Sequence, residues 1–356
     1  MGDLIAMKPY HTIELSRKVD IFYQPSISDK IGEICSQIKK CKKIFIVTDD
    51  NVAPLYLEKI SQSLKAYGFD VSSYTFSHGE QSKKLSTIEK IYDALIAFSM
   101  TRKDMLLALG GGVVGDMTGF AAATYMRGID YIQVPTSLLA MVDSSIGGKT
   151  GVDLPQGKNL IGAIYQPLAI ITDPDFLKTL PKKYYTDGLC EIIKYGYISD
   201  SSILDKPDDI SVIEKCIKIK SDIVEKDERE SGLRMLLNFG HTLGHAIEKC
   251  MNFTGIGHGE AVCKGMYISL KVGQYLGITE KAEIEKYLSL CNVQGLNPYT
   301  DISADLLFNA ASGDKKKQDS FINFIFVKTP GAPVIEKIEL TALKEAYIKV
   351  FGDKYE

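Results

Sequence analysis

The sequence contains no Cys-x-x-Cys pair, and its seven cysteines are dispersed along 356 residues. This spacing argues against a cysteine-ligated zinc site and against a disulfide framework, so we expect a protein of the reducing cytoplasm. No apolar run reaches the length of a membrane-spanning helix, and residues 1–10 lack the apolar stretch of a signal peptide. The net charge of -3 gives no bulk attraction to nucleic acid or to an anionic membrane, so we expect neither as a partner.

Strand and helix patterns alternate in the first half of the chain. A content of 45% hydrophobic and 24% charged residues is that of an ordinary globular protein, and a chain of this length is expected to form two domains. The alternation favours a mostly parallel sheet covered by helices. The strand patterns cover residues 43–48, 69–76, 105–109, 131–134 and 169–172, and the helical patterns cover 54–67 and 86–99.

The second half is mainly helical from about residue 183 onward. Its one clear strand-like run covers residues 321–327. We place the boundary near Leu180–Pro181, which predicts an α/β domain over residues 1–180 and a mainly α-helical domain over 181–356. The helical patterns cover residues 184–198, 210–228, 233–251, 260–275, 282–290 and 343–351.

A glycine-rich turn, GGGVVGD, follows the predicted strand 105–109 and contains G-x-G-x-x-G. Glycines let the backbone approach a pyrophosphate, and the N-terminus of the next helix favours its negative charge. The turn lies more than 100 residues into the chain, and the acidic residue expected about 20 positions later is missing. A tight turn with a helix cap is the alternative. The group Asp49-Asp50-Asn51, at another strand end, could bind ribose hydroxyls, so the combined pattern favours a nucleotide.

A second polar loop covers residues 135–151 and is dense in hydroxyls, glycines and charge. Lysines flanked by glycine, with hydroxyls nearby, suit a phosphate or a carboxylate. The spacing is not that of a P-loop. A surface loop with incidental lysines is the alternative. We favour a functional loop because four polar residues crowd this glycine-rich region: Asp143, Lys149, Lys158 and Asn159.

Three of the five histidines, His241, His245 and His258, fall in one short stretch. His241 and His245 are four residues apart and share one face of a helix, and His258 returns after a glycine-rich break. Imidazoles from two elements suit a metal site with room for a carboxylate. Capping or core histidines are the alternative.

Charged and other polar side chains also interrupt the apolar patterns of the second half. Arg234 and Asn238 extend the face of His241 and His245 on the predicted helix 233–251, and such a polar stripe is costly to bury without a ligand. Glu191 is three residues before Lys194, which by itself predicts only a surface salt bridge. Glu191 becomes a candidate ligand because the histidine cluster needs an oxygen donor.

Taken together, these motifs resemble the 3-dehydroquinate synthase family of sugar-phosphate cyclases. The resemblance runs from about Asp49 to Lys316. Its most specific segments are GGGVVGD, VPTSLLAMVDSSIGGKTGVD, GKNLIGAIYQP, GLCEIIKYG, LLNFGHTLGHAIE and HGEAV. It implies a Rossmann-like NAD-binding α/β domain followed by a mainly α-helical domain that carries the metal, and a homodimer.

The resemblance also implies residue roles. Glu191, His241 and His258 would bind Zn²⁺ or Co²⁺, and His245 would contact substrate instead. Arg127 would reach the site of the neighbouring subunit. The NAD contacts would be Asp49, Asn51, Glu80, Lys83, Gly111, Gly112, Asp116, Thr136, Ser137, Leu139, Lys149, Lys158, Phe176 and Thr179. The substrate contacts would be Asp143, Lys149, Asn159, Lys194, Lys220, Arg234, Asn238, His245 and Lys315, where Lys316 could replace Lys315.

The reaction implied by the family turns 3-deoxy-D-arabino-heptulosonate 7-phosphate into 3-dehydroquinate and phosphate, in the shikimate pathway of aromatic amino acid biosynthesis. NAD oxidises a ring hydroxyl, phosphate is eliminated, NADH reduces the ketone, the ring opens and an intramolecular aldol closes the carbocycle. The net reaction is therefore that of a lyase. The alternatives are a cyclase acting on another sugar phosphate, a metal-dependent polyol or alcohol dehydrogenase of related fold, and a non-catalytic NAD-binding protein.

Overall fold

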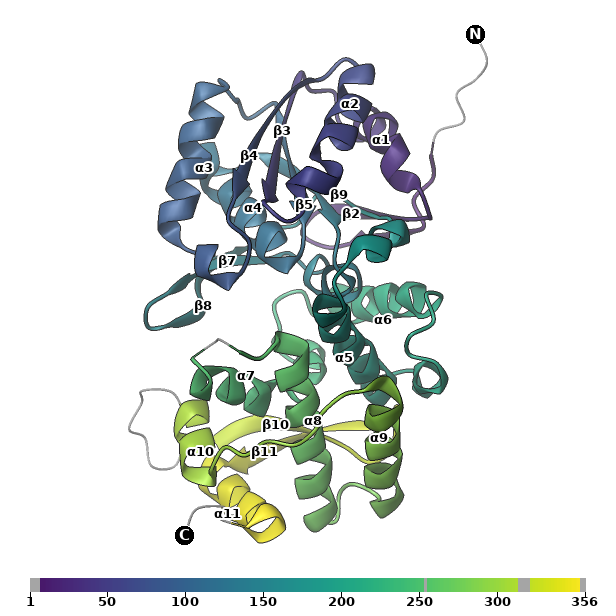
Figure 1. Ribbon diagram of the computed structural model, residues 1–356, viewed down its shortest axis with the longest axis vertical. Coiled ribbons are helices and arrows are strands. Elements are labelled where there is room, and N and C mark those ends of the chain that lie inside the picture. Colours follow the sequence, from purple (N-terminus) through teal and green to yellow (C-terminus); the bar gives the residue numbers. More distant parts are fainter. Residues whose placement is uncertain (1–6, 253–254, 313–320, 353–356) are drawn as a thin grey trace. The chain divides into compact units, whose positions relative to one another are not determined.

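The computed structural model describes residues 7–252, 255–312 and 321–352. Contacts within the chain divide it into two compact units (Figure 1). The first unit comprises Met1–Leu180 and Lys220–Glu228, and the second comprises Pro181–Ile219 and Arg229–Glu356. The long helix α6 (Val212–Lys226) therefore contributes residues to both units.

A seven-stranded sheet forms the centre of the first unit, in the order β1-β2-β9-β6-β5-β3-β4. Only β1 is antiparallel to its neighbour, and the other strands pair in parallel. All six residues of β5 are buried, as expected for a parallel strand covered on both faces. The strands are β1 (His11–Glu14), β2 (Lys18–Tyr23), β3 (Lys43–Asp49), β4 (Asp70–Phe76), β5 (Met105–Gly110), β6 (Asp130–Pro135) and β9 (Ala169–Thr172).

Helices α3 and α4 pack on one face of this sheet. Alternate residues of β3 and β5, such as Phe45 and Leu106, join Ile88 of α3 and Met117 of α4 in one buried cluster. The helices are α1 (Ile31–Ile38), α2 (Glu58–Ala66), α3 (Leu85–Ala97) and α4 (Gly112–Thr124). The short helical turns are Ile27–Lys30, Ala53–Leu57, Glu80–Ser82, Tyr125–Arg127, Ala140–Ser144 and Pro174–Thr179.

The polar loop predicted over residues 135–151 is more ordered than expected. It contains the helical turn Ala140–Ser144 and enters an antiparallel hairpin, β7 (Lys149–Leu154) and β8 (Gly157–Ile164). A Cβ added to Gly162 would lie 2.2 Å from the carbonyl oxygen of Thr150. The glycines that suggested a loop thus permit two strands to approach closely.

The second unit consists mainly of helices, with one two-stranded hairpin of β10 and β11 (Figure 1). Its core joins α7, α8, α10, α11 and the hairpin, and includes Leu243, Ile268, Leu307, Phe326 and Leu343. The elements are α5 (Lys182–Ile198), α7 (His241–Cys250), α8 (His258–Tyr275), α9 (Lys281–Gln294), α10 (Ala304–Ser312), β10 (Phe321–Val327), β11 (Pro333–Glu339), α11 (Leu340–Phe351) and the short turns Ser201–Asp205 and Leu233–Asn238.

The predicted fold class, a mostly parallel α/β unit and a mainly helical one, is confirmed. None of the helices in the described ranges has both the length and the apolar character needed to cross a membrane. The prediction of one continuous helix over residues 233–251 is wrong. The chain forms a 3₁₀ segment at Leu233–Asn238 and begins α7 only at His241. Gly240 breaks the helix because its φ of 78° lies in the left-handed region.

Candidate functional site

Helix α5 holds Glu191 and Lys194 in the interior of the second unit. The side chains of both residues are 1% exposed, and the ammonium of Lys194 contacts Oε2 of Glu191. Asp187 lies one helical turn before Glu191 and therefore on the same face. The surface salt bridge that the sequence favoured for Glu191 and Lys194 is thus a buried ion pair.

Asp187 fixes the start of α8, and with it the position of His258. Its Oδ1 accepts a hydrogen bond of 3.0 Å from the backbone N–H of Gly259. Burial raises the pKa of the Asp187 carboxyl. A Cβ on Gly259 would lie 2.2 Å from the carbonyl oxygen of Asp187, so only glycine allows this approach. Because Asp187 and Glu191 share a face of α5, the same helix that caps α8 also turns Glu191 toward His258.

Helix α7 reaches the same place through close contact with α8. A Cβ on Gly265 of α8 would lie 2.0 Å from the carbonyl oxygen of Gly240, which immediately precedes α7. The two helices therefore approach each other backbone to backbone, and His241, the first residue of α7, lies beside His258, the first residue of α8. Their ring centroids are 5.3 Å apart.

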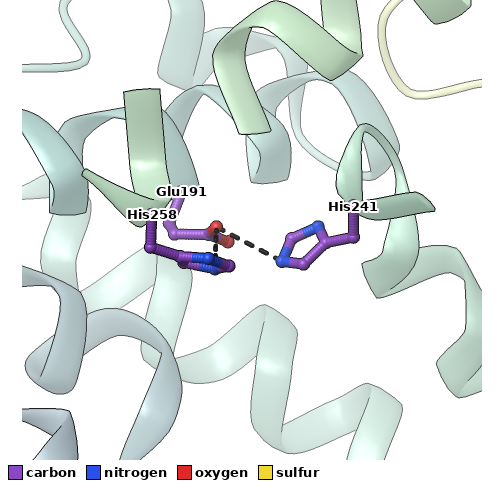
Figure 2. A group of neighbouring side chains, drawn as sticks. All are labelled: Glu191, His241 and His258. Atoms are coloured by element: carbon purple, nitrogen blue, oxygen red, sulfur yellow. Dashed lines mark ion pairs between the residues drawn. The ribbon is translucent and has the colours of Figure 1, made fainter. Parts of the chain in front are cut away.

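Glu191, His241 and His258 converge on one point (Figure 2). Oε1 of Glu191 lies 3.4 Å from Nε2 of His241 and 3.7 Å from Nε2 of His258. Ligand atoms that each lie about 2.0–2.2 Å from one tetrahedral ion are about 3.4 Å from each other. The three donor atoms therefore have the types and the spacing that a zinc-like cation requires.

The backbone sets the tautomer of His241. Its Nδ1 lies 3.2 Å from the carbonyl oxygen of Phe239, which can only accept a hydrogen bond. Nδ1 therefore carries the proton of the neutral ring, and the lone pair of Nε2 is directed toward Glu191. This is the form in which imidazole binds a metal.

A second cluster shares His258 with the first. It consists of His245, Glu248 and His258, whose nearest donor atoms also lie within 4.8 Å of one another. The side chain of His245 is 57% exposed, whereas that of Glu248 is 4% exposed. In this second cluster His258 offers Nδ1, which lies 3.3 Å from Oε2 of Glu248. The two clusters thus use opposite nitrogens of the same imidazole.

Gly259→Ala tests how α8 is held against α5. Glycine near a helix start is otherwise less stable than alanine by about 0.5–1 kcal/mol, so an unhindered site would gain stability. The clash with Asp187 predicts the opposite sign, a fall of about 1–3 kcal/mol in the free energy of unfolding, together with weaker metal binding. Urea denaturation and metal titration measure both quantities.

Glu260→Ala is the matched control on the same helical turn. It removes an exposed carboxylate whose Oε1 lies 3.3 Å from Lys264, and it should change the free energy of unfolding by less than about 1 kcal/mol. A Gly259→Ala variant as stable as the native chain would show that α8 and α5 do not depend on this contact.

Buried cations accompany the metal cluster in the second unit. Arg234 and Lys194 are each 1% exposed. Nδ2 of Asn238 donates a hydrogen bond of 2.8 Å to Oε1 of Glu230. The charge of Lys194 is met by the carboxylate of Glu191, and buried cations of this kind can also attract an anionic ligand.

In the first unit, five of the predicted NAD contacts lie at the carboxyl ends of three adjacent strands. Asp49 ends β3, Gly111 and Gly112 follow β5, and Thr136 and Ser137 follow β6. The backbone N–H of Thr136 donates to the carbonyl oxygen of Gly110, and a Cβ on Gly111 would lie 3.3 Å from Oγ of Ser137. This sheet edge, with the N-terminus of α4 beside it, is where parallel α/β sheets bind nucleotides.

Asp49 and its neighbour Asn51 form a tight turn at this edge. Oδ1 of Asp49 accepts hydrogen bonds from the backbone N–H groups of Asn51 and Val52. Burial raises the pKa of Asp49, and these two hydrogen bonds oppose the effect. The turn conformation was the sequence-based alternative for this segment, and it leaves the side chain of Asn51 at the strand end.

A charged cluster joins five further predicted contacts. Nζ of Lys83 lies 2.7 Å from Oδ2 of Asp116 and 2.6 Å from Oδ1 of Asn159. Glu80 lies 3.8 Å from Lys83 and 3.7 Å from Lys158. Burial opposes the charge of Lys83, but the carboxylates of Asp116 and Glu80 outweigh it and hold its pKa above the usual value. Burial raises the pKa of Asp116.

Two other pairs of predicted residues lie together. The ammonium of Lys220 contacts the side chain of Asp143 and lies 2.7 Å from its carbonyl oxygen. Phe176 and Thr179 share the turn Pro174–Thr179, and both contact Tyr56. Tyr56 was not predicted from the sequence, because its only signal is a place shortly after Asp49.

For the remaining predicted residues, the structure gives a position in the fold. Leu139 directly precedes the turn Ala140–Ser144, and Lys149 is exposed at the start of β7. Arg127 is exposed, and its φ of 66° follows a φ of 50° at Met126. Two successive left-handed residues other than glycine are strained, and strain of this kind gathers at functional sites. Lys315 and Lys316 lie outside the described residues.

Two buried or partly buried acids near the predicted residues were missed. Glu248 is 3% exposed and contacts both His245 and His258, and Glu230 contacts Asn238. The spacing of Glu248 three residues after His245 was an available signal. Glu230 is eight residues before Asn238 and is separated from the 3₁₀ segment by non-helical residues. Helical periodicity therefore could not reveal the contact between Glu230 and Asn238.

Comparisons with known proteins show the family of the chain. A family model described as the N-terminal part of 3-dehydroquinate synthase matches residues 73–187, and one described as its C-terminal part matches residues 188–317. The 3-dehydroquinate synthase of Clostridium acetobutylicum is 44% identical over 340 residues, which cover 92% of this chain and 94% of that protein.

Two solved structures of related cyclases share the fold. The structure of 2-deoxy-scyllo-inosose synthase with carbaglucose-6-phosphate, NAD⁺ and Co²⁺ is 25% identical, with a TM-score of 0.84 over 96% of this chain and 100% of that one. The 2-epi-5-epi-valiolone synthase of Streptomyces hygroscopicus subsp. jinggangensis, with NAD⁺ and Zn²⁺ bound, is 25% identical, with a TM-score of 0.85 over 97% of this chain and 99% of that one. With both family models matched in order and close relatives along nearly the whole chain, the chain belongs to the 3-dehydroquinate synthase family.

Proposed function

We propose that the chain is a 3-dehydroquinate synthase, a lyase that converts 3-deoxy-D-arabino-heptulosonate 7-phosphate to 3-dehydroquinate and phosphate. The observation that carries the proposal is the cluster of Glu191, His241 and His258 beside the buried cation of Lys194. A polyhydroxy acid phosphate has hydroxyls for a metal and two anionic ends for cations. This chemistry matches the donor set and the buried charge.

The residues present fit both a divalent metal and NAD. One carboxylate oxygen and two imidazole nitrogens form the usual catalytic zinc donor set, which also accepts Co²⁺. The glycine turn after β5 and the polar residues at the adjacent strand ends fit a dinucleotide. When bound, NAD supplies reversible hydride transfer, and the metal lowers the pKa of a substrate hydroxyl.

Residues of the chain then bind and orient the substrate. Lys194 and Arg234 offer buried positive charge to its carboxylate or phosphate, and Asn238 offers an amide for a hydroxyl. His245 is exposed and has a ring nitrogen suited to accept or donate a proton. Because binding fixes the phosphate near the carbon that loses a proton, the substrate itself can serve as base. The further substrate contacts are Asp143, Lys149, Asn159, Lys220 and Lys315.

The proposal includes a homodimer and a cytoplasmic location. Arg127 is exposed with a strained backbone, as expected for a side chain that reaches the site of a second subunit. The dispersed cysteines fit a reducing compartment.

A turnover assay tests the proposed activity. The purified chain is mixed with the heptulosonate phosphate, Zn²⁺ or Co²⁺, and NAD in an amount well below that of the substrate. We expect phosphate and dehydroquinate to form in equal amounts until the substrate is used, without accumulation of NADH. Because NADH is consumed within each turnover, substoichiometric NAD suffices.

The same assay distinguishes the alternatives. NADH that accumulates in step with substrate loss would identify a dehydrogenase. Phosphate release from sedoheptulose 7-phosphate or glucose 6-phosphate, but not from the heptulosonate, would identify a cyclase for another sugar. Glu191→Gln is the negative control, because it should remove the metal-dependent step.

A further inference from the structure

Glu248, on α7, places one carboxylate oxygen between two histidines. Oε2 lies 2.9 Å from Nδ1 of His245 and 3.3 Å from Nδ1 of His258. The residue is 3% exposed, so its carboxylate is shielded from water. Because a buried carboxylate needs donors, these two imidazoles are part of what satisfies it.

The contact with His258 determines which nitrogen of that ring can bind a metal. A carboxylate accepts hydrogen bonds, so Nδ1 of His258 must carry the proton that faces Glu248. The lone pair of the neutral ring is then on Nε2, the atom that lies 3.7 Å from Oε1 of Glu191. Glu248 therefore does for His258 what the carbonyl of Phe239 does for His241, at 3.2 Å from its Nδ1.

The contact with His245 orients the ring proposed to handle protons. With Nδ1–H directed at Glu248, the other nitrogen, Nε2, is the one able to accept a proton. The ring of His245 stacks on that of His258, with centroids 5.5 Å apart and planes at 26°. One buried carboxylate thus holds a metal-binding ring and a solvent-accessible ring in a fixed relation.

Glu248 could instead bind a metal directly, with His245 and His258, because their donor atoms also lie within 4.8 Å. In the observed ring orientation Nδ1 of His258 faces Glu248 and Nε2 faces Glu191, so that arrangement would use Nδ1 as a ligand, whereas the cluster with Glu191 would use Nε2. A neutral imidazole offers only one lone pair, so the two clusters exclude each other. The carbonyl of Phe239 already prepares Nε2 of His241 for the cluster with Glu191, which favours that cluster.

We infer that Glu248 is a positioning residue that, through one oxygen, fixes the metal-binding tautomer of His258 and the orientation of His245. The part that concerns His258 depends only on the metal cluster. The part that concerns His245 rests on the proposed function. The two parts predict different losses when Glu248 is changed, one in metal affinity and one in turnover of the metal-saturated protein.

The test compares Glu248→Gln and Glu248→Asp with the native chain. Metal affinity is measured on the metal-free protein by competition with a chelator for Co²⁺, and the visible spectrum of bound Co²⁺ reports the ligand geometry. Glu248→Gln should weaken Co²⁺ binding about 10–100-fold, because removing the hydrogen-bond partner of a metal-binding histidine has effects of this size. Even when Co²⁺ is saturating, the kcat of Glu248→Gln should be lower than that of the native chain. Its KM should change by a smaller factor than its kcat. Glu248→Asp keeps the charge and should restore part of both losses.

Glu283→Gln is the matched control, because it also removes a buried carboxylate from a helix of the same unit. Glu283 is 1% exposed, and its Oε1 lies 2.7 Å from Nζ of Lys286. Among the described residues it pairs with Lys286 rather than with any of the three histidines, and its variant should bind Co²⁺ as the native chain does. Equal weakening in both variants would overturn the inference, because it would show a general effect of removing a buried charge.

Two further results would overturn the inference. Native Co²⁺ affinity and spectrum in Glu248→Gln would show that His258 needs no partner. Retention of Co²⁺ by His241→Ala, with complete loss in Glu248→Gln, would make Glu248 a ligand. If Glu248→Gln does not fold, Glu248→Asp decides alone, with an altered Co²⁺ spectrum expected and a native one contradicting the inference. The Co²⁺ measurements use no substrate, so they remain decisive if the chain lacks synthase activity.

Discussion

His258→Ala should lose its bound metal, whereas His245→Ala should retain it and lose turnover. A tetrahedral zinc site of four ligands binds with about 10–16 kcal/mol, or roughly 3 kcal/mol per ligand. Removal of His258 should therefore weaken metal binding by at least about 100-fold. His245 is not one of the three donors in the cluster with Glu191, so its loss should leave metal affinity nearly unchanged. Turnover of His245→Ala should fall by about 10²–10⁴, the usual contribution of a general acid or base.

The pair of variants separates the two overlapping clusters. Metal content after dialysis and chelator competition give the affinities, and phosphate release gives turnover at saturating metal. If His245→Ala and His258→Ala lose metal equally, the ion binds in the cluster with Glu248, and the assignment of Glu191 is wrong. His78→Ala is the control for metal affinity, because that histidine pairs with Asp50 in the first unit and should leave the bound metal unchanged.

The strands that could be predicted from the sequence are those with continuous apolar runs. Residues 105–109 are buried throughout in β5, so the pattern and the burial coincide. β11 was missed because its residues, Pro333–Glu339, read PVIEKIE, which lacks both a continuous apolar run and a strict apolar/polar alternation, and none of them is buried. β7 and β8 were missed because glycine and lysine at 148–151 and 157–158 look like loop residues. The apolar pattern of a sequence therefore predicts strands that are buried on both faces more readily than strands of surface hairpins.

The candidate site was predictable where residue type alone limits the chemistry. Histidines at 241 and 258 indicated a metal, but spacing along the chain could not bring Glu191 to them. That contact depends on Asp187 and Gly259, which dock α8 against α5 at a distance of 72 residues in the sequence. The break in the helix at Gly240 likewise depends on the close approach of α8. The periodicity of apolar residues along the chain carries no information about that approach. Tertiary contacts therefore determine the third member of the cluster and the start of α7, neither of which local sequence patterns could predict.

Lys194→Met should produce the largest loss of stability in the second unit when metal is absent. The variant keeps the apolar stem but leaves the carboxylate of Glu191 in an interior where its side chain is 1% exposed. Breaking a buried ion pair from one side costs about 3–5 kcal/mol, and this should appear in the free energy of unfolding from urea denaturation. Saturating Zn²⁺ or Co²⁺ should recover most of the loss, because the cation neutralises the same carboxylate.

A double variant shows whether the lost stability comes from the pair. Lys194→Met combined with Glu191→Gln removes both charges, so it should be more stable in the metal-free state than Lys194→Met alone. If the losses in the free energy of unfolding are strictly additive, the two side chains do not interact. The buried ion pair would then not stabilise the site. Turnover separates stability from function: metal should restore folding to Lys194→Met but leave its rate lower by about 10²–10³, because the substrate anion has lost a fixed positive charge.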